Sequence, residues 1–261
     1  WSAWQRQGKR MPVVLALGGA PALTWAASAP LPRGVDELAM VGLVTGSPVM
    51  TTACDSCDLE VPAGAEFILE GYLAPGEFRP EGPFGNHTGY YAPAAPAPVF
   101  HLLSLRRRPH PLYPCTVVGP PPRENYWLAK ASERLLLPLL QLEVPEVVEL
   151  CFLPAGIFHR AALVSVSGGE GPDLLHRLRQ TPLLRGSRLL VLFDADDDLH
   201  DGGRLLWLLL NQASPGRDWL LSEEGIGIDA RRRGRPLTAR VAVDPVTAAL
   251  VERRWGEYGI D

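Results

Sequence analysis

The stretch PEGPFGNHTGYY, residues 80–91, carries more information about fold and function than any other part of the chain. The residues Gly82, Pro83, Gly85 and Gly89 disfavour a continuous helix or strand here. The sequence therefore predicts an irregular loop with rigid corners. Such loops often present the binding and catalytic residues of a domain.

The same loop places polar side chains between aromatic ones. The polar members are Glu81, Asn86, His87 and Thr88, and the aromatic members are Phe84, Tyr90 and Tyr91. Together they suggest one side of a binding pocket. A carboxylate in such an apolar setting has a raised pKa and can exchange protons near neutral pH. The residues alone leave a second interpretation equally open, a well-packed hairpin loop with one exposed glutamate.

Short strands surround this loop in the sequence. Between residues 49 and 118, apolar runs alternate with Gly and Pro, and three of them predict strands: Glu66–Tyr72, Val99–Leu105 and Leu112–Val118. Several short strands at this spacing indicate an antiparallel barrel or sandwich.

The N-terminal part predicts one strand and two helices. The run Pro12–Leu17 reads as a buried strand that ends at a glycine pair. The Ala-rich run Ala20–Ala29 predicts a helix stopped by prolines. A second helix is expected over Val35–Leu43, with Asp36 near its start.

The C-terminal half has an α/β pattern. Arg123–Glu143 predicts a long helix kinked at Pro138. Four residues at four-residue spacing are expected to share one face of it: Trp127, Ala131, Leu135 and Leu139. Strands and helices then alternate over Val147–Phe152, Ala161–Val166, Asp173–Thr181, Arg188–Phe193 and Arg204–Asn211. We therefore expect a first domain over residues 1–140 and an α/β domain over residues 141–261.

Composition and charge exclude several classes of protein. Of the 261 residues, 46% are hydrophobic, which is enough for a core and too many for a disordered chain. The net charge is −4 and the clusters Arg106–Arg108 and Arg231–Arg233 read as solvated surface, so no nucleic-acid partner is expected. No apolar run reaches the ~18 residues of a membrane span, and no secretory signal is recognised. Four scattered cysteines favour a reduced, cytoplasmic chain.

Three patterns resemble metal or phosphate sites without completing them. Cys54 and Cys57 form a single C-x-x-C that lacks the second pair of ligands a zinc site needs. The acidic run Asp194–Asp201 lacks the Gly and Glu of a calcium loop, so a solvated loop is expected. Gly18 and Gly19 follow a strand without a dinucleotide or P-loop pattern, and indicate a tight turn.

A family resemblance decides what the residue pattern leaves open. The segment Glu81–Tyr91 resembles the E-G-P-F-G-[D/E]-H-T-G-Y signature of UbiD-type decarboxylases. Further segments resemble the same family in the same order: Pro12–Pro32, Gly34–Glu37, Asp58–Gly71, Val118–Leu140, Gly156–His159, Phe193–Asp201, Gly227–Ala230 and Arg254–Ile260. The resemblance covers nearly the whole chain, and its motifs are long.

The resemblance implies a fold of the α+β or α/β class, with a split β-barrel flavin-binding domain followed by an α/β oligomerisation domain. It implies prenylated FMN as cofactor, together with a divalent metal (Mn or Mg) and K⁺. Members of the family add or remove CO2 on aromatic or α,β-unsaturated acids without net oxidation. The cofactor acts as an electron sink, and a protein carboxylic acid protonates the carbon.

The resemblance also assigns roles to individual positions. Glu81 matches the first acid of the family's Arg-Glu-Glu network, and Glu37 matches a carboxylate that binds the divalent metal. The segment Ser28, Ala29 and Pro30 is expected to contact the cofactor.

Two positions depart from the family pattern. Asn86 stands where the family carries Asp or Glu as the direct proton donor, and an amide has no acidic proton to give. Ile226 stands at a cofactor-binding position where many members have a Lys. The Asn, Arg and His residues with which the family holds metal and cofactor lie upstream of the segments matched here.

Two hypotheses therefore remain. In the first, the chain belongs to an active prenylated-FMN decarboxylase in which Glu81, acting through water, supplies the proton. In the second, it is a degenerate, non-catalytic subunit or a binder of a flavin or an acidic ligand. The resemblance further implies a flavin prenyltransferase as supplier of the cofactor, and a homodimer or higher homo-oligomer.

Overall fold

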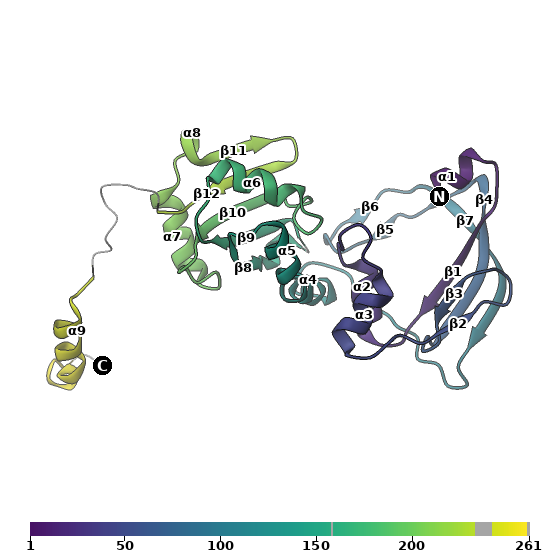
Figure 1. Cartoon of the computed structure of the whole chain (residues 1–261), viewed down its shortest axis with the longest axis horizontal. Helices are drawn as coiled ribbons and strands as arrows, with labels where there is room; N and C mark the ends of the chain where they lie inside the picture. Colours follow the sequence, from purple (N-terminus) through teal and green to yellow (C-terminus); the bar gives the residue numbers. More distant parts are fainter. Residues whose placement is uncertain (158, 233–241, 260–261) are drawn as a thin grey trace. The chain divides into compact units, whose positions relative to one another are not determined.

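The computed structural model describes residues 1–157, 159–232 and 242–259 (Figure 1). They belong to two compact units, Trp1–Ala230 and Arg231–Asp261. The fold mixes helices and sheets, which confirms the predicted α+β class at this level. Three residues of the segments quoted above, Phe158, Arg233 and Ile260, lie outside the described residues.

The first sheet has three antiparallel strands in the order β1–β4–β7. The strand β1 (Met11–Leu17) lies where a strand was predicted, but the expected burial is wrong, because none of its residues is buried. The strands β4 (Phe67–Glu81) and β7 (Ala95–Arg107) run well beyond the predicted bounds. The sheet is open, with β1 and β7 at its edges, and the described strands form no closed barrel.

The two faces of this sheet differ in cover. A hairpin of β2 (Thr51–Ala53) and β3 (Glu60–Pro62) covers one face, where Ile68 is buried in a small core. Strand register and alternation place ten apolar side chains on the other face. These are Met11, Val13, Leu15, Leu17, Phe67, Leu69, Leu73, Phe100, Leu102 and Leu105, and none of them is buried. An apolar face of this size is normally packed against another layer.

Two short helices follow the first strand, as the sequence predicts. They are α2 (Pro21–Ser28) and α3 (Glu37–Thr45). Asp36 caps α3 by accepting a hydrogen bond from the backbone N–H of Ala39 at 2.9 Å, and Gly46 ends it in the left-handed conformation.

The expected single helix over residues 123–143 is wrong, because α4 (Glu124–Leu135) and α5 (Leu137–Glu143) are separate helices. Pro138 lies in the first turn of α5, where its missing N–H costs no hydrogen bond, so it starts a helix rather than kinking one.

The four residues expected to share a face differ in their surroundings. Ala131 and Leu139 pack against the larger core, whereas Trp127 is 67% exposed and Leu135 39% exposed. The buried residues of α4 are Ala129, Ser132 and Glu133, so two of the three are polar. Ser132 Oγ accepts a hydrogen bond from Trp25 Nε1 at 3.1 Å, which ties α4 to α2. Because Ser132 and Glu133 are polar, the apolar periodicity of the sequence does not mark the side of α4 that faces the core.

The second sheet has five strands in the order β11–β12–β10–β9–β8, and its three central strands are parallel. The strands are β8 (Val147–Phe152), β9 (Ala161–Val166), β10 (Leu189–Asp194), β11 (Trp219–Ser222) and β12 (Gly225–Asp229). This confirms the α/β pattern expected for the C-terminal half.

Helices cover both faces of this sheet. The helix α6 (Gly171–Gln180) packs in the larger core with Leu190 and Leu192, and also with Trp25 of α2. The helix α7 (Gly202–Gln212) packs in the second core on the opposite face, with Val191 and Phe193. The larger core contains residues from both sides of position 140. The domain boundary predicted at that position therefore stays a prediction.

The remaining elements are short. They are α1 (Ser2–Arg6), β5 (Phe84–Gly85), β6 (Tyr91–Ala92), the 3₁₀ helices Pro154–Gly156 and Trp255–Glu257, α8 (Pro215–Asp218) and α9 (Pro245–Arg253). The strand expected over Leu112–Val118 is wrong, because Pro111 and Pro114 remove ladder donors and no partner strand lies beside it in the described chain. None of the helices in the described ranges is long and apolar enough to cross a membrane.

Candidate functional site

The connection between α2 and α3 carries four of the predicted site residues. Ser28 ends α2 and donates its hydroxyl proton to the carbonyl of Trp25 at 3.0 Å, so its orientation is fixed by the helix. Ala29 follows in extended conformation, and Pro30 comes after it. Glu37 begins α3 and is exposed.

The carboxylate of Glu37 is available to a ligand. It makes no hydrogen bond or ion pair with any residue that the structure describes. A hard carboxylate oxygen suits Mg²⁺ or Mn²⁺. The donor chemistry of this position therefore fits the divalent metal that the family resemblance implies.

Replacing Asp36 with alanine is expected to lower the free energy of unfolding by about 1 kcal/mol, because the first turn of α3 loses its side-chain cap. Urea unfolding followed by circular dichroism measures this change. The matched control is Arg33→Ala, an exposed side chain in the same connection, which should leave the midpoint within error. Equal midpoints for all three proteins would show that the Asp36 cap does not stabilise α3.

The loop at residues 80–91 is more regular than its Gly and Pro content predicts. Strand β4 continues through Glu81, and the short strands β5 and β6 pair with each other after the cis bond between Gly82 and Pro83. Positive φ angles at Gly82 (102°) and Gly89 (84°) let the chain turn between these pieces. The loop is therefore a hairpin, and the expectation of no regular structure is wrong.

The apolar surroundings expected for Glu81 are absent from the described chain. Glu81 is exposed, and so are the aromatic rings of Phe84 (65%), Tyr90 (78%) and Tyr91 (78%). The loop presents these rings to solvent instead of packing them around the carboxylate.

Asn86 is fixed in a tight turn. Its Oδ1 accepts hydrogen bonds from the backbone N–H of Thr88 at 2.8 Å and from the Thr88 hydroxyl at 2.5 Å. Its own N–H donates to the carbonyl of Tyr90 at 3.2 Å. An aspartate could accept the same two bonds, so this geometry does not require an amide.

Ile226 lies far along the chain, in β12. It pairs with Leu189 and Leu221 on the neighbouring strands, and its N–H donates to the carbonyl of Arg188 at 2.7 Å. Ile226, the α2–α3 connection and the loop at residues 80–91 belong to three different parts of the fold. The structure therefore presents three separate groups.

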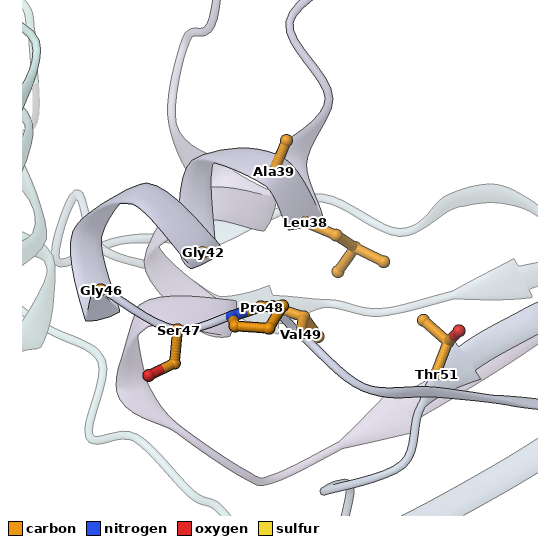
Figure 2. Close-up of a pocket in the computed structure, with 8 residues that line it drawn as sticks. All are labelled: Leu38, Ala39, Gly42, Gly46, Ser47, Pro48, Val49 and Thr51. Carbon is orange, nitrogen blue, oxygen red and sulfur yellow. The ribbon is translucent and has the colours of Figure 1, made fainter.

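A hollow beside α3 has a volume of about 480 Å³. Figure 2 shows its lining, which comes from α3 and the segment that follows it: Leu38, Ala39, Gly42, Gly46, Ser47, Pro48, Val49 and Thr51. None of these side chains titrates, and none belongs to the predicted site. The hollow therefore offers apolar contact and no acid–base chemistry.

Sequence reasoning missed a fully buried acid, Glu70 of β4. Its carboxylate accepts hydrogen bonds from the N–H and hydroxyl of Ser56 at 2.7 and 2.8 Å, and from Arg106 Nη2 at 2.7 Å. Burial acts to raise the pKa of Glu70, but these hydrogen bonds and the Arg106 charge outweigh it and lower the pKa to about 2. The sequence does carry a sign of this buried acid, because Glu70 alternates with Ile68 and so faces the same side of the apolar run EFILEGY.

Two family models match the chain. Residues 1–121 match the 3-octaprenyl-4-hydroxybenzoate carboxy-lyase Rift-related domain, and residues 126–244 match the C-terminal domain of the same carboxy-lyase. The chain belongs to the UbiD family. The resemblance seen in the sequence is thereby confirmed.

Relatives and solved structures agree with this family. An uncharacterized protein of Archaeoglobus fulgidus is 40% identical over 217 residues, which are 82% of this chain and 45% of that protein. The UbiD-class enzyme HmfF from Pelotomaculum thermopropionicum, solved as an evolved dimeric form in complex with prFMN, is 28% identical with a TM-score of 0.76. That match covers 95% of this chain and 58% of HmfF.

A third match supports the fold alone. Vanillic acid decarboxylase from Sedimentibacter hydroxybenzoicus, in closed form, has a TM-score of 0.85 at 24% identity, over 100% of this chain and 60% of that one. The UbiD chain described here spans about half the length of the curated relatives it matches.

Proposed function

We propose that this chain is part of a UbiD-like non-oxidative decarboxylase or carboxylase that acts on an aromatic or α,β-unsaturated acid with prenylated FMN. The hairpin Glu81–Tyr91 carries the proposal, because it presents Glu81 and the family signature on an exposed, ordered turn. HmfF, a relative in fold and sequence, was solved with prFMN bound.

The α2–α3 connection is the part that would hold the cofactor. Ser28, Ala29 and Pro30 would contact the flavin, and Glu37 would bind a divalent metal, Mn or Mg, beside its phosphate, with K⁺ as a further ion. Ile226 would contribute apolar contact where other members have a Lys. The bound prenylated flavin supplies an electron sink for the loss of CO2.

Proton transfer falls to Glu81 in this proposal. An ionisable carboxylate exposed on the hairpin can exchange a proton with substrate directly or through one water. The amide of Asn86 accepts hydrogen bonds from Thr88 and has no acidic proton. The chain therefore keeps one of the two acids of the family pattern.

The open sheet β1–β4–β7 supports a split barrel that this stretch of chain does not close. Its uncovered apolar face fits the inside of such a barrel, and the longer UbiD relatives have further residues that could complete it. We propose that the completed barrel, over residues 1–140, binds the flavin. The α/β domain over residues 141–261 would then mediate a homodimer or higher homo-oligomer.

The proposal also covers the source of the cofactor and the cellular location of the protein. A flavin prenyltransferase would supply the cofactor, since FMN itself lacks the prenyl-derived ring. The protein would work in the cytoplasm, where four unpaired cysteines are stable.

A second candidate function is a non-catalytic UbiD-like subunit or a binder of a flavin or an acidic ligand. It is favoured by two substitutions in the family pattern. Asn86 and Ile226 both replace residues with which the family acts on the cofactor and substrate.

Isotope exchange separates the two functions. Protein loaded with prenylated FMN is incubated with ¹³C-bicarbonate and a panel of aromatic and α,β-unsaturated acids, and label in the carboxyl group is measured by mass spectrometry. The proposal predicts exchange into at least one acid, and a loss of about 10²-fold or more in Glu81→Gln. If the protein binds the cofactor but ¹³C enters the acids no faster than in buffer alone, the decarboxylase proposal is rejected in favour of the non-catalytic function.

A further inference from the structure

The C-x-x-C segment approaches the buried acid Glu70. One sulfur each from Cys54 and Cys57 and one carboxylate oxygen of Glu70 lie within 4.8 Å of one another. The sequence offered Cys54 and Cys57 alone, as half of a zinc site. Strand β4 brings a third donor from sixteen residues further along, as Glu70 stands at position 70 and Cys54 at position 54.

We propose that Cys54, Cys57 and Glu70 bind a thiophilic divalent cation of the Zn²⁺ class, with water in the fourth position. Zn²⁺ accepts thiolate sulfur at about 2.3 Å and carboxylate oxygen at about 2.0–2.2 Å in a tetrahedron, which separates ligand atoms by about 3.5–3.8 Å. Shifts of about 1 Å or less bring the three donors to that geometry. The inference does not depend on the proposed decarboxylase function.

The surroundings of Glu70 orient it for this role. Ser56 and Arg106 hold both carboxylate oxygens, and Arg106 Nε also approaches Asp55 Oδ2 at 3.4 Å. Hydrogen bonds to a ligating carboxylate are the usual means of fixing its orientation.

The site also has an entry path from solvent. Cys54 and Cys57 are partly exposed while Glu70 is fully buried, so the sulfurs lie on the solvent side. A bound cation would replace the thiol protons and fasten the β2–β3 hairpin onto β4.

Cobalt is the probe for this site. Reduced, chelator-treated protein is titrated with Co²⁺ without oxygen, and the thiolate-to-cobalt absorption band is recorded. We expect one Co²⁺ per chain, displacement by one equivalent of Zn²⁺, and weaker binding at lower pH as the thiols hold their protons. Mutating a residue that only hydrogen-bonds a metal ligand lowers metal affinity by about 10–100-fold. Cys57→Ser removes a ligand itself, so we expect it to weaken Co²⁺ binding by about 100-fold or more.

The matched control is Cys115→Ser, which removes an exposed cysteine outside the cluster and should leave the titration unchanged. Far-UV circular dichroism confirms that each variant is folded. Absence of a thiolate band, a band of equal strength in Cys57→Ser, or a Cys54–Cys57 disulfide that excludes the metal in freshly purified protein would each overturn the proposal.

Discussion

Replacing Asn86 with aspartate is expected to raise the rate of decarboxylation, or of carboxyl exchange, by about 10²-fold or more in protein loaded with prenylated FMN. A positioned general acid contributes about 10²–10⁴-fold to such a step, and Asn86 occupies the position of the family acid without being able to donate a proton. The substitution exchanges the amide nitrogen for an oxygen, so it alters the chemistry and not the shape of the loop.

The structure explains why the Asn86→Asp variant should keep its turn. The carboxylate that this substitution introduces can accept the same hydrogen bonds from the N–H and hydroxyl of Thr88 that Asn86 accepts now. Asn86→Gln is the control, because it keeps an amide and should give no gain. If the aspartate variant binds the cofactor and turns over no faster than the parent, Asn86 is not the limiting defect.

Replacing Arg106 with methionine is expected to lower the free energy of unfolding by about 3 kcal/mol at pH 7. The change leaves the carboxylate of Glu70 fully buried without its cationic partner, and breaking a buried ion pair costs about 3–5 kcal/mol. The lower end applies because Arg106 is partly exposed and Ser56 still donates two hydrogen bonds to Glu70. Arg107→Met, one residue on and exposed, is the control and should cost little.

The pH dependence of this effect has a defined direction. The pKa of Glu70 is lowered from 4.5 to about 2, so its pairing stabilises the fold fully above pH 4.5 and is lost as the pH falls toward 2. The difference between parent and Arg106→Met should therefore be largest at neutral pH and shrink below pH 4.5. Urea unfolding at a series of pH values measures it, and a difference that grows in acid would contradict the assigned ion pair.

The sequence predicts those elements of this fold that buried apolar residues define. The strands β8 and β9 begin and end where expected, because β-branched runs such as Val147–Phe152 are bounded by turn residues. The helix α3 is found from its Asp36 cap. Predictions fail where polar residues are buried with partners. Ser132 and Glu133 face the core on α4, and no apolar period marks that face.

The candidate site depends on a different kind of information. Residue pattern alone left the loop at residues 80–91 between a pocket and a plain hairpin, and only the family resemblance gave Glu81 and Asn86 roles. The third donor to the cysteine pair, Glu70, comes from another strand. Its approach depends on the packing of the β2–β3 hairpin over β4, which local sequence does not encode.

Cofactor retention tests the central proposal most directly. The protein is co-expressed with a flavin prenyltransferase, purified, and examined by absorbance and by mass spectrometry of the released cofactor, beside Glu37→Gln and the control Glu143→Gln, which makes the same change at an exposed position at the end of α5. We predict that the parent and Glu143→Gln carry prenylated FMN and that Glu37→Gln retains markedly less, because the metal at the flavin phosphate loses its carboxylate. Folded parent protein that carries no flavin, or a Glu37→Gln variant that retains as much as the parent, would contradict a prenylated-FMN site at the α2–α3 connection.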